Sequence, residues 1–379
     1  MEILIFMAGI YIHIPFCKQK CTYCDFHFST NFSTYRTNML DCMLKELELR
    51  SVELKDEQIE TIYFGGGTPS LLNSTEILAF IEKVKSLHQV SKTAEITLEA
   101  NPDDISQSSI LEWKNAGINR LSIGIQSFDN EDLTWMNRAH NSDESLKAVK
   151  ICQEAGISNI SIDLIYGLPN MDVNRWEKQL NLAISLNVSH ISAYCLTVEE
   201  KTALHKLVET KKILPAENEL QALHFELLQK KLKEADFIQY EISNFGKEGF
   251  FSKHNSSYWK GEKYQGIGPS AHSFDRKTRS WNIANNPVYI KKISENILPS
   301  EIEILSNKDF FNEMLLIGLR TIWGVSLDKL NEIEPPSAIF TSKINKLLSE
   351  NKAEIKNQQL ILNSNGMLFA DSIAQDLFL

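Results

Sequence analysis

The chain has 379 residues, of which 43% are hydrophobic and 23% are charged. These values exclude a disordered or fibrous chain and suit one large folded domain with an appendage. The formal net charge of -10 argues against broad contact with nucleic acid, because binding to phosphates needs clustered Lys and Arg. We therefore expect no nucleic-acid partner.

The first residues, Met1 to Phe6, are apolar but lack the basic start and the long apolar run of a secretory signal. No stretch approaches the roughly 20 apolar residues that span a bilayer. Three of the six cysteines lie within eight residues and three are scattered, which favours metal ligation over a disulfide framework. We expect a cytoplasmic protein without a transmembrane segment.

Predicted strands and helices alternate up to about residue 200. The strands are expected at 9–16, 59–64, 94–99, 119–125, 158–165 and 189–195, and the helices at 33–51, 74–88, 106–115, 142–154 and 172–186. Such alternation predicts βαβ units around a parallel sheet. Polar residues and glycines recur where the strands end, which is where parallel (β/α) barrels carry their sites. No Gly-x-Gly-x-x-Gly follows the first strand, so a dinucleotide-binding fold is disfavoured. The pattern predicts an α/β fold with a partial (β/α)6 TIM-type barrel.

The remainder of the chain changes character. Residues 201–235 predict a long Lys/Glu-rich helix, whereas residues 240–290 are rich in Gly, Asn, Ser and aromatic residues and show little periodicity. Helical spacing returns at 308–335 and 337–350, and residues 353–369 predict two short strands with a turn at Asn365-Gly366. This order predicts a C-terminal α+β appendage of the winged-helix kind.

The three clustered cysteines have the spacing Cys17-x3-Cys21-x2-Cys24. Three thiolates on one loop can each bind one iron of a 4Fe–4S cluster, and the fourth iron then stays open to an exchangeable ligand. The spacing alone also suits a zinc site in which His13 or His27 is the fourth ligand. Both metals therefore remain open on the cysteine pattern.

A glycine run, Gly65-Gly66-Gly67-Thr68-Pro69, ends the second predicted strand. Glycines leave backbone N–H and C=O groups unshielded, so a small polar ligand can approach them closely. A tight turn would usually need one glycine, so three in succession favour a ligand site. The run therefore favours a cluster that shares its open iron with a small ligand.

These motifs together resemble the radical S-adenosylmethionine (SAM) superfamily, and within it the group named for HemN, the oxygen-independent coproporphyrinogen III oxidase. The resemblance covers nearly the whole chain. Its strings are Tyr11-x-His13-x-Pro15-Phe16-Cys17-x3-Cys21-x-Tyr23-Cys24-Asp25-Phe26, the glycine run, Glu99-Ala-Asn-Pro102, Arg120-Leu-Ser-Ile-Gly-Ile-Gln126-Ser-Phe128, Arg138-Ala-His140 and Asp163-Leu-Ile-Tyr-Gly-Leu-Pro169. It implies a 4Fe–4S cluster on Cys17, Cys21 and Cys24. Around SAM it implies Tyr11, Tyr23, Gly66, Gly67, Thr68, Glu99, Gln126, Arg138 and Asp163.

Two functions remain open within that group. One is the oxidase, which decarboxylates coproporphyrinogen III with a radical from SAM, and the other is a heme chaperone of the HemW type. The oxidases carry a further cysteine in a Cys-x-Cys ending, where this chain has Cys24-Asp25-Phe26, and a longer extension before the cysteines. The string His254-Asn255-Ser-Ser-Tyr258-Trp259 matches one that is associated with the chaperone branch. The resemblance therefore favours the chaperone.

His254 is the axial heme ligand that the resemblance implies, because neutral imidazole is a common partner of iron. Tyr258 and Trp259 would then pack on the porphyrin. The local string alone favours a structural histidine among aromatic residues. His272, in the segment 266–273, is a second candidate for heme or for a polar contact.

The resemblance also implies the partners and the division of the chain. Besides heme, we expect a heme-acceptor protein, such as a membrane-associated respiratory enzyme, and a homodimer is an open alternative to a monomer. The expected division is a radical SAM core (1–235), a barrel-closing and heme-associated segment (236–300) and a C-terminal HemN-like domain (301–379).

Overall fold

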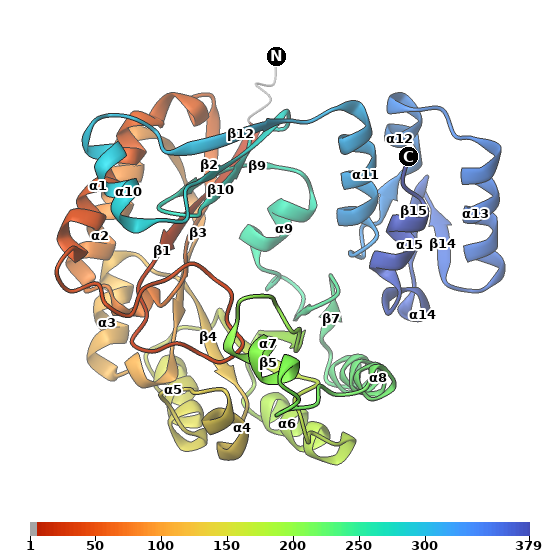
Figure 1. Cartoon of the computed structure of the whole chain (residues 1–379), viewed down its shortest axis with the longest axis horizontal. Coiled ribbons are helices and arrows are strands. Elements are labelled where there is room, and N and C mark those ends of the chain that lie inside the picture. Colours follow the sequence, from red (N-terminus) through yellow and green to blue (C-terminus); the bar gives the residue numbers. More distant parts are fainter. Residues whose placement is uncertain (1–5) are drawn as a thin grey trace.

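The computed structural model describes residues 6–379 and shows an α/β core that carries a smaller C-terminal unit (Figure 1). The prediction that the first residues are not a secretory signal concerns residues 1–5, which lie outside the described residues. Within the described part, no helix has the length and apolar character needed to cross a membrane.

Six parallel strands, adjacent in chain order, form the centre of one twelve-stranded sheet. They are β1 (Phe6–Ile14), β2 (Glu57–Gly66), β3 (Gln89–Ala100), β4 (Arg120–Gln126), β5 (Ile160–Tyr166) and β6 (His190–Cys195). The helices after them are α1 (Arg36–Leu49), α2 (Ser74–Leu87), α3 (Gln107–Ala116), α4 (Asn130–Trp135), α5 (Ser142–Glu154), α6 (Val173–Ser185), α7 (Ala203–Glu209) and α8 (Asn218–Glu234). Figure 1 shows helices along the outer side of the curved sheet. The predicted α/β fold with six βα units is confirmed.

Local sequence explains why these elements form where they do. On β4, Leu121, Ile123 and Ile125 are fully buried at every second position, as a strand covered by helices requires. Helix α2 begins at a capping box in which Asn73 and Glu76 bond each other's backbone N–H.

Residues 236–304 extend the sheet at both edges. Strands β7 (Ile238–Gln239) and β8 (Asn244–Gly246) join β6, while β9 (Lys263–Ile267), β10 (His272–Phe274), β11 (Thr278–Asn282) and β12 (Ser300–Ile304) continue from β1. Between the two edges the chain passes through α9 (Lys253–Trp259), which packs against β1, β2 and β9. In the described residues β6 pairs with β8 and not with β1, so the barrel is partial.

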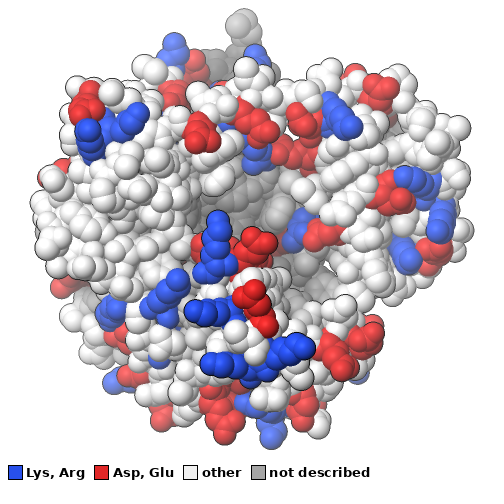
Figure 2. All heavy atoms as spheres, in the orientation of Figure 1, with Lys and Arg blue, Asp and Glu red and all other residues white. Residues whose placement is uncertain are grey.

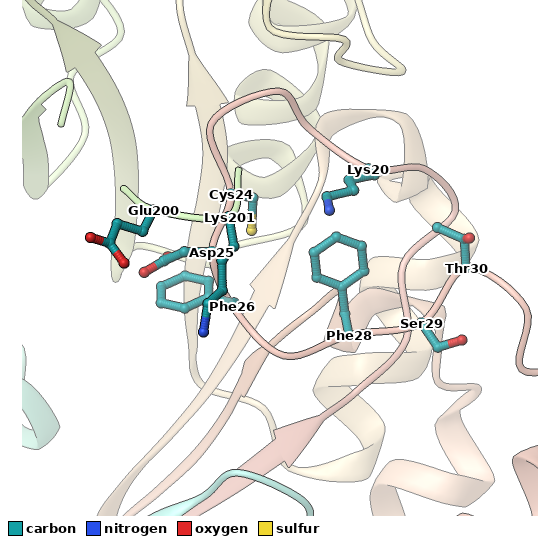
Figure 3. A pocket seen from close by; sticks show the side chains of 9 residues that line it. All are labelled: Lys20, Cys24, Asp25, Phe26, Phe28, Ser29, Thr30, Glu200 and Lys201. Atoms are coloured by element: carbon teal, nitrogen blue, oxygen red, sulfur yellow. The ribbon is translucent and has the colours of Figure 1, made fainter. Parts of the chain in front are cut away.

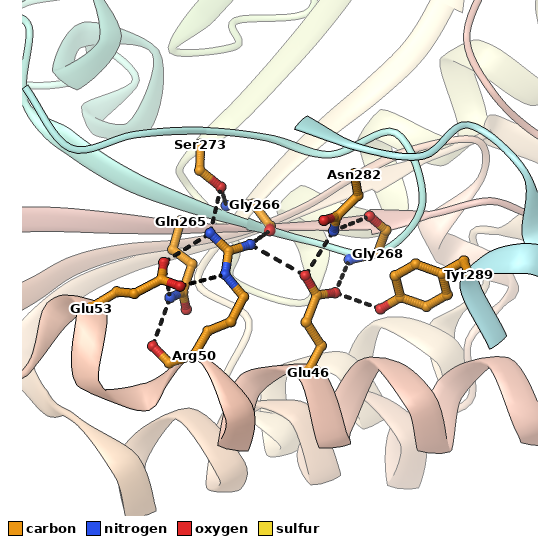
Figure 4. Close-up of polar contacts among 9 residues, drawn as sticks. All are labelled: Glu46, Arg50, Glu53, Gln265, Gly266, Gly268, Ser273, Asn282 and Tyr289. Atoms are coloured by element: carbon orange, nitrogen blue, oxygen red, sulfur yellow. Dashed lines mark hydrogen bonds and ion pairs between the residues drawn. The ribbon is translucent and has the colours of Figure 1, made fainter. Parts of the chain in front are cut away.

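A buried ion pair, which we call the Glu46–Arg50 network, ties the β9–β10 segment to α1 (Figure 4). The Glu46 carboxylate is fully buried and accepts hydrogen bonds from Arg50 Nη1 (3.2 Å), Gly268 N (2.8 Å), Asn282 Nδ2 (2.7 Å) and Tyr289 Oη (2.5 Å). Arg50 donates in turn to the Gly266 carbonyl and the Ser273 hydroxyl. Tyr289 belongs to α10 (Asn286–Ser294), so one carboxylate joins three elements.

The C-terminal unit contains, in order, α11 (Asn307–Gly318), β13 (Val325–Ser326), α12 (Leu327–Ile333), α13 (Ala338–Ser349), β14 (Ala353–Lys356) and β15 (Gln359–Leu362), with β15 between β13 and β14. Three helices and a three-stranded sheet in this order agree with the predicted winged-helix-like appendage. In Figure 1 the unit lies beside the open side of the barrel.

Three local predictions are wrong. The hairpin turns at Asn357 and Gln358, which both have positive φ, whereas Asn365-Gly366 lie in α14 (Ser364–Met367), ahead of α15 (Ala370–Asp376). The predicted helix at 201–235 is two helices, because Pro215 lies in the break between α7 and α8. The predicted helix at 308–335 is likewise α11 and α12 with β13 between them.

Candidate functional site

The inner face of the barrel is polar. The inward positions are every second residue of β1–β6. Most of them are polar or glycine: Gly9, Tyr11, His13, Thr61, Tyr63, Gly65, Glu95, Thr97, Glu99, Arg120, Ser122, Gly124, Ser161, Asp163, His190, Ser192 and Tyr194, with Ile165 as an apolar exception. Barrels of this type are commonly filled by branched apolar side chains instead. The polar lining therefore indicates a site for a polar ligand inside the barrel.

The cysteines lie on a loop that follows β1 and is held at several points. Cys17 N–H donates to the Ser29 carbonyl (3.1 Å), and Ser29 N–H donates to the Pro15 carbonyl (2.9 Å). Between Cys21 and Cys24, Thr22 N–H donates to the Met136 carbonyl (3.1 Å), just after α4. These bonds hold the loop across the carboxyl end of the strands.

The three thiols influence one another and meet hydrogen-bond donors. Burial, with a smaller contribution from the neighbouring cysteine sulfurs, raises the pKa of Cys17 to about 12 and that of Cys24 to about 11. The Thr68 hydroxyl donates to Cys17 Sγ (3.4 Å) and Arg138 Nη1 to Cys21 Sγ (3.4 Å). Among residues 6–379, no three His, Cys, Asp or Glu side chains are close enough together to hold a metal ion as they stand. Three cysteines on one loop that interact electrostatically, two of them with hydrogen-bond donors beside the sulfur, fit a cationic cluster, which binds thiolates.

The two histidines of the zinc alternative are already engaged. His13 Nε2 lies 2.8 Å from the His27 carbonyl oxygen and His13 Nδ1 lies 3.3 Å from Tyr11 Oη. His27 Nε2 lies 2.7 Å from Asn286 Oδ1 on α10. His13 therefore has no ring nitrogen left for a fourth bond to zinc, and of the two histidines only His27 keeps one, Nδ1, so the contacts weaken the zinc alternative. The His13–His27 and His27–Asn286 contacts also hold the cysteine loop against β1 and α10.

The glycine run lets the end of β2 lie against the end of β1. Gly66 has a φ of +104°, and a Cβ there would lie 2.6 Å from the His13 ring. A Cβ on Gly67 would lie 2.5 Å from the Phe16 carbonyl oxygen, and its N–H donates to Ile14 O (2.8 Å). The run therefore brings Thr68 to Cys17, besides leaving backbone groups unshielded.

Two of the predicted SAM residues are half-buried carboxyl groups within the barrel. Glu99 accepts hydrogen bonds from Tyr63 Oη (2.8 Å) and Gly66 N (3.2 Å), and Asp163 accepts from Ser122 Oγ (3.3 Å). Burial raises the pKa of Glu99 to about 7 and also raises the pKa of Asp163. Removal of two carboxylates from water is offset when a cationic ligand lies between them, so the pair suits a cation such as an ammonium group.

Arg138 lies between the cysteine loop and the strand ends. Its Nη2 donates to Asn101 Oδ1 (2.7 Å) and to the Gly124 carbonyl (2.9 Å), while its buried Nε has no partner. Gln126, at the end of β4, has a positive φ of 67°. Tyr23 lies between two of the cysteines and is partly buried. The structure therefore gathers the predicted SAM residues around the carboxyl ends of β1–β5.

His254 lies elsewhere, toward the amino ends of the strands. Its Nδ1 is 2.7 Å from Thr61 Oγ1, its Nε2 is 2.7 Å from Tyr258 Oη, and the side chain is 1% exposed. The Tyr11 ring lies 6.2 Å from the His254 ring and 6.0 Å from the His13 ring, so it separates His254 from the cysteine loop. As it stands, His254 has no free ring nitrogen for iron. His272 is exposed and lies against Trp281 on β11.

A cavity of about 400 Å³ opens beside Cys24 (Figure 3). Its lining also includes Lys20, Asp25, Phe26, Phe28, Ser29, Thr30, Glu200 and Lys201. The Phe26 side chain is 65% exposed. Figure 2 shows a wider hollow on this face between the barrel and the C-terminal unit, with both acidic and basic side chains at its rim.

Residues 11–183 match the family model described as the radical SAM superfamily, so the fold and the cysteine site together define a radical SAM domain. The chain belongs to the family of the heme chaperone HemW. It is 32% identical over 371 residues to "Heme chaperone HemW" of Bacillus subtilis (strain 168), across 97% of this chain and 98% of that protein. It is also 30% identical over 373 residues to "Heme chaperone HemW" of Mycobacterium tuberculosis (strain ATCC 25618 / H37Rv), across 97% of this chain and 94% of that protein.

A solved structure shares the fold. The coproporphyrinogen III oxidase HemN from Escherichia coli, titled a radical SAM enzyme, superposes with a TM-score of 0.84 over 99% of this chain and 90% of its own. Its sequence identity of 18% makes this a likeness of fold. The same architecture thus holds a protein named as an enzyme and proteins named as chaperones, and function must be argued from the site.

Sequence reasoning missed several residues that build the site. Asn101 holds Arg138, Tyr63 bonds Glu99, and Thr61 bonds His254. The available signal was the polar residue at every second position of β2–β6, since strands covered on both faces usually read as continuous apolar runs. That alternation would have placed Thr61, Tyr63 and Arg120 inside the barrel.

Proposed function

We propose that the chain is a heme chaperone that binds heme, a 4Fe–4S cluster and SAM, and that transfers heme to an acceptor protein. The observation that carries the proposal is the ending of the cysteine loop. Asp25 and the exposed Phe26 line the cavity beside Cys24 where an oxidase would place another thiol. Two relatives that match this chain over almost its full length are named as heme chaperones, which supports the same choice.

The chain's own residues would divide the binding of the cluster and SAM as follows. Cys17, Cys21 and Cys24 would bind three irons, and a 4Fe–4S cluster supplies an open iron and an electron to its ligand. The Thr68 hydroxyl and the Arg138 guanidinium, which already donate to two of the sulfurs, would stabilise the thiolates. The carboxylates of Glu99 and Asp163 would bind the positively charged groups of SAM. The unpaired Arg138 Nε would bind its carboxylate.

In the proposed chaperone, His254 would bind the iron of heme once its Nε2 atom is free. Nε2 can reach iron only after the Tyr258 hydroxyl releases it, because the two atoms lie 2.7 Å apart. The nitrogen is suited to iron in other respects, because burial lowers the pKa of His254 to about 3 and the ring is therefore neutral at physiological pH. His272 is a weaker candidate, because it lies outside the barrel on β10.

One anaerobic experiment distinguishes the heme chaperone from the oxidase. With its cluster reconstituted, the full chain should bind about one heme in an absorption titration, because the proposal provides one iron-binding histidine. With SAM and a reductant, it should leave coproporphyrinogen III unchanged. Turnover of coproporphyrinogen would overturn the chaperone proposal in favour of the oxidase, and so would a failure to bind heme in both the reduced and the oxidised protein.

Binding of SAM should strengthen as the pH rises through about 7. Glu99 is protonated below its raised pKa of about 7 and ionised above it, and only the carboxylate attracts a cation. Between pH 6 and pH 7.5 we expect the Kd for SAM to fall by roughly three- to tenfold, as one charge-assisted hydrogen bond would give. The measurement is calorimetric titration of the holoprotein.

Two variants test whether Glu99 is the group that titrates. Glu99→Gln should bind SAM more weakly and should remove the pH dependence, whereas the exposed Glu112→Gln on α3 should behave as the wild type. A pH dependence that persists in Glu99→Gln would assign the titrating group to another residue.

A further inference from the structure

The His254 ring is held from both sides by hydroxyl groups. Thr61 Oγ1, on β2, lies 2.7 Å from Nδ1, and Tyr258 Oη, one turn further along α9, lies 2.7 Å from Nε2. Thr61 and His254 are 2% and 1% exposed, so water cannot replace the Thr61 hydroxyl. The arrangement therefore fixes both the orientation of the ring and the place of its proton.

Hydrogen-bond chemistry favours one of the two tautomers. A neutral imidazole has one N–H and one lone pair, so one hydroxyl must donate to it and the other must accept from it. The Tyr258 phenol is more acidic than the Thr61 hydroxyl and is therefore the better donor. In this assignment Tyr258 O–H donates to Nε2 and Nδ1–H donates to Thr61 Oγ1, so the lone pair lies on Nε2.

That tautomer is the one that a metal ligand needs. A histidine that binds a metal commonly donates its other N–H to an oxygen acceptor, which orients the ring and makes the ligating nitrogen more basic. Thr61 occupies the position of this acceptor. Iron at Nε2 would therefore require no proton to leave His254, and only the Tyr258 hydroxyl would have to be replaced.

Aromatic residues line the Nε2 side of the His254 ring, which Tyr258 covers. This side is less buried than the Nδ1 side. Tyr258 packs edge-on against His254 at 4.9 Å and against Tyr264 of β9 at 4.5 Å, and Tyr264 lies 6.2 Å from Phe274 of β10. Tyr258 and Tyr264 are both half-buried, in contrast to His254. A flat aromatic macrocycle could stack within this group if the Tyr258 ring turned aside.

The helix that carries both residues is short. Helix α9 has seven residues, begins at the Ser252 side-chain cap, and is tied to β3 by the bond from Lys253 Nζ to Thr93 O (3.0 Å). The first turn is held further by the bonds from Ser252 N to Tyr240 Oη (3.4 Å) and from His254 N to Glu95 Oε1 (3.3 Å). The phenol would therefore be displaced by rotation of the half-buried Tyr258 side chain rather than by movement of the whole helix.

We propose that Tyr258 caps the iron-binding nitrogen of His254 and that Thr61 fixes the tautomer of this histidine, so that heme binds by displacing the phenol. The proposal rests on the proposed function and specifies how its heme site is controlled. Binding forms the Fe–Nε2 bond and breaks the Tyr258–His254 hydrogen bond, while both protons stay on their atoms. Tyr258 and Thr61 are thus positioning residues with opposite effects on heme.

The test compares heme titrations of the reconstituted full-length protein. Tyr258→Phe removes the competing hydroxyl and should bind heme about fivefold more tightly, with the wild-type Soret spectrum, because one hydrogen bond no longer has to be broken. Thr61→Val, of similar volume, removes the acceptor for Nδ1–H and should bind heme about five- to tenfold more weakly. Tyr166→Phe is the matched control, because this buried tyrosine packs against Trp176 of α6, away from His254, and its Kd should be unchanged.

The outcomes separate this proposal from the function on which it rests. Wild-type protein that fails to bind heme overturns the proposed function itself. Heme binding that is unchanged in His254→Ala, or that moves in the same direction in Tyr258→Phe and Thr61→Val, overturns the capping proposal and leaves the chaperone standing. Thermal unfolding of each variant shows whether a changed Kd reflects folding, and opposite shifts in Kd cannot arise from loss of fold alone.

Discussion

Replacement of Cys24 by serine is expected to leave the anaerobically purified chain with almost none of the iron and sulfide of one 4Fe–4S cluster. Only three cysteines share the loop, so each thiolate must hold its own iron, and loss of one leaves two irons without a protein ligand. Burial makes the Cys17 thiol hard to ionise unless a cluster binds it, since its pKa is raised to about 12. Iron and sulfide analysis and the visible absorption of the reconstituted protein measure this loss.

Cys195→Ser provides the matched control. Cys195 is a half-buried free cysteine at the end of β6 and is not part of the loop, so its variant should keep the full cluster. A Cys24→Ser protein that retains its iron would contradict the assignment. Stoichiometric zinc in the wild-type protein would restore the alternative that the engaged His13 and His27 argue against.

The candidate site was predictable from the sequence to the extent that its residues follow one another in short motifs. The cysteine spacing, the glycine run and the polar residues after each strand all lie within a few residues of a strand end, and parallel strands bring such ends to one edge of the sheet. His254 could not be placed in this way. It is carried by α9, between two strands that join opposite edges of the sheet, so its position depends on the whole topology.

The fold, too, was predictable only where the sequence has a local period. Six βα units follow from local periodicity, and they appear where the sequence predicts them. The strands of residues 236–304 were not predicted, because β7, β8 and β10 have two or three residues each and are too short to show a period. The wrong hairpin turn has a different cause, since Asn-Gly usually marks a turn, whereas here Asn357-Gln358 take the positive φ values instead.

Replacement of Glu46 by alanine is expected to lower the free energy of unfolding by roughly 3–5 kcal/mol, which is typical of removing one partner of a buried ion pair. Glu46 is fully buried, and its loss would leave the Gly268 N–H, the Asn282 amide and the Tyr289 hydroxyl without this acceptor, and would leave Arg50 with Glu53 as its remaining carboxylate partner. Gly268 packs against the His13 carbonyl, where β1 leads into the cysteine loop. The variant should therefore also lose its cluster faster than the wild type when exposed to air.

Denaturant unfolding of the full chain measures this effect, and a surface ion pair on the same helix supplies the control. Glu48 is exposed and pairs with Lys83, so Glu48→Ala should change the stability by less than about 1 kcal/mol. The double variant Glu46→Leu/Arg50→Met tests the cause, because removal of both charges leaves no buried ion unpaired. It should be more stable than Glu46→Ala. If it is equally unstable, the cost comes from the lost hydrogen bonds to Gly268, Asn282 and Tyr289 rather than from the charge of Arg50.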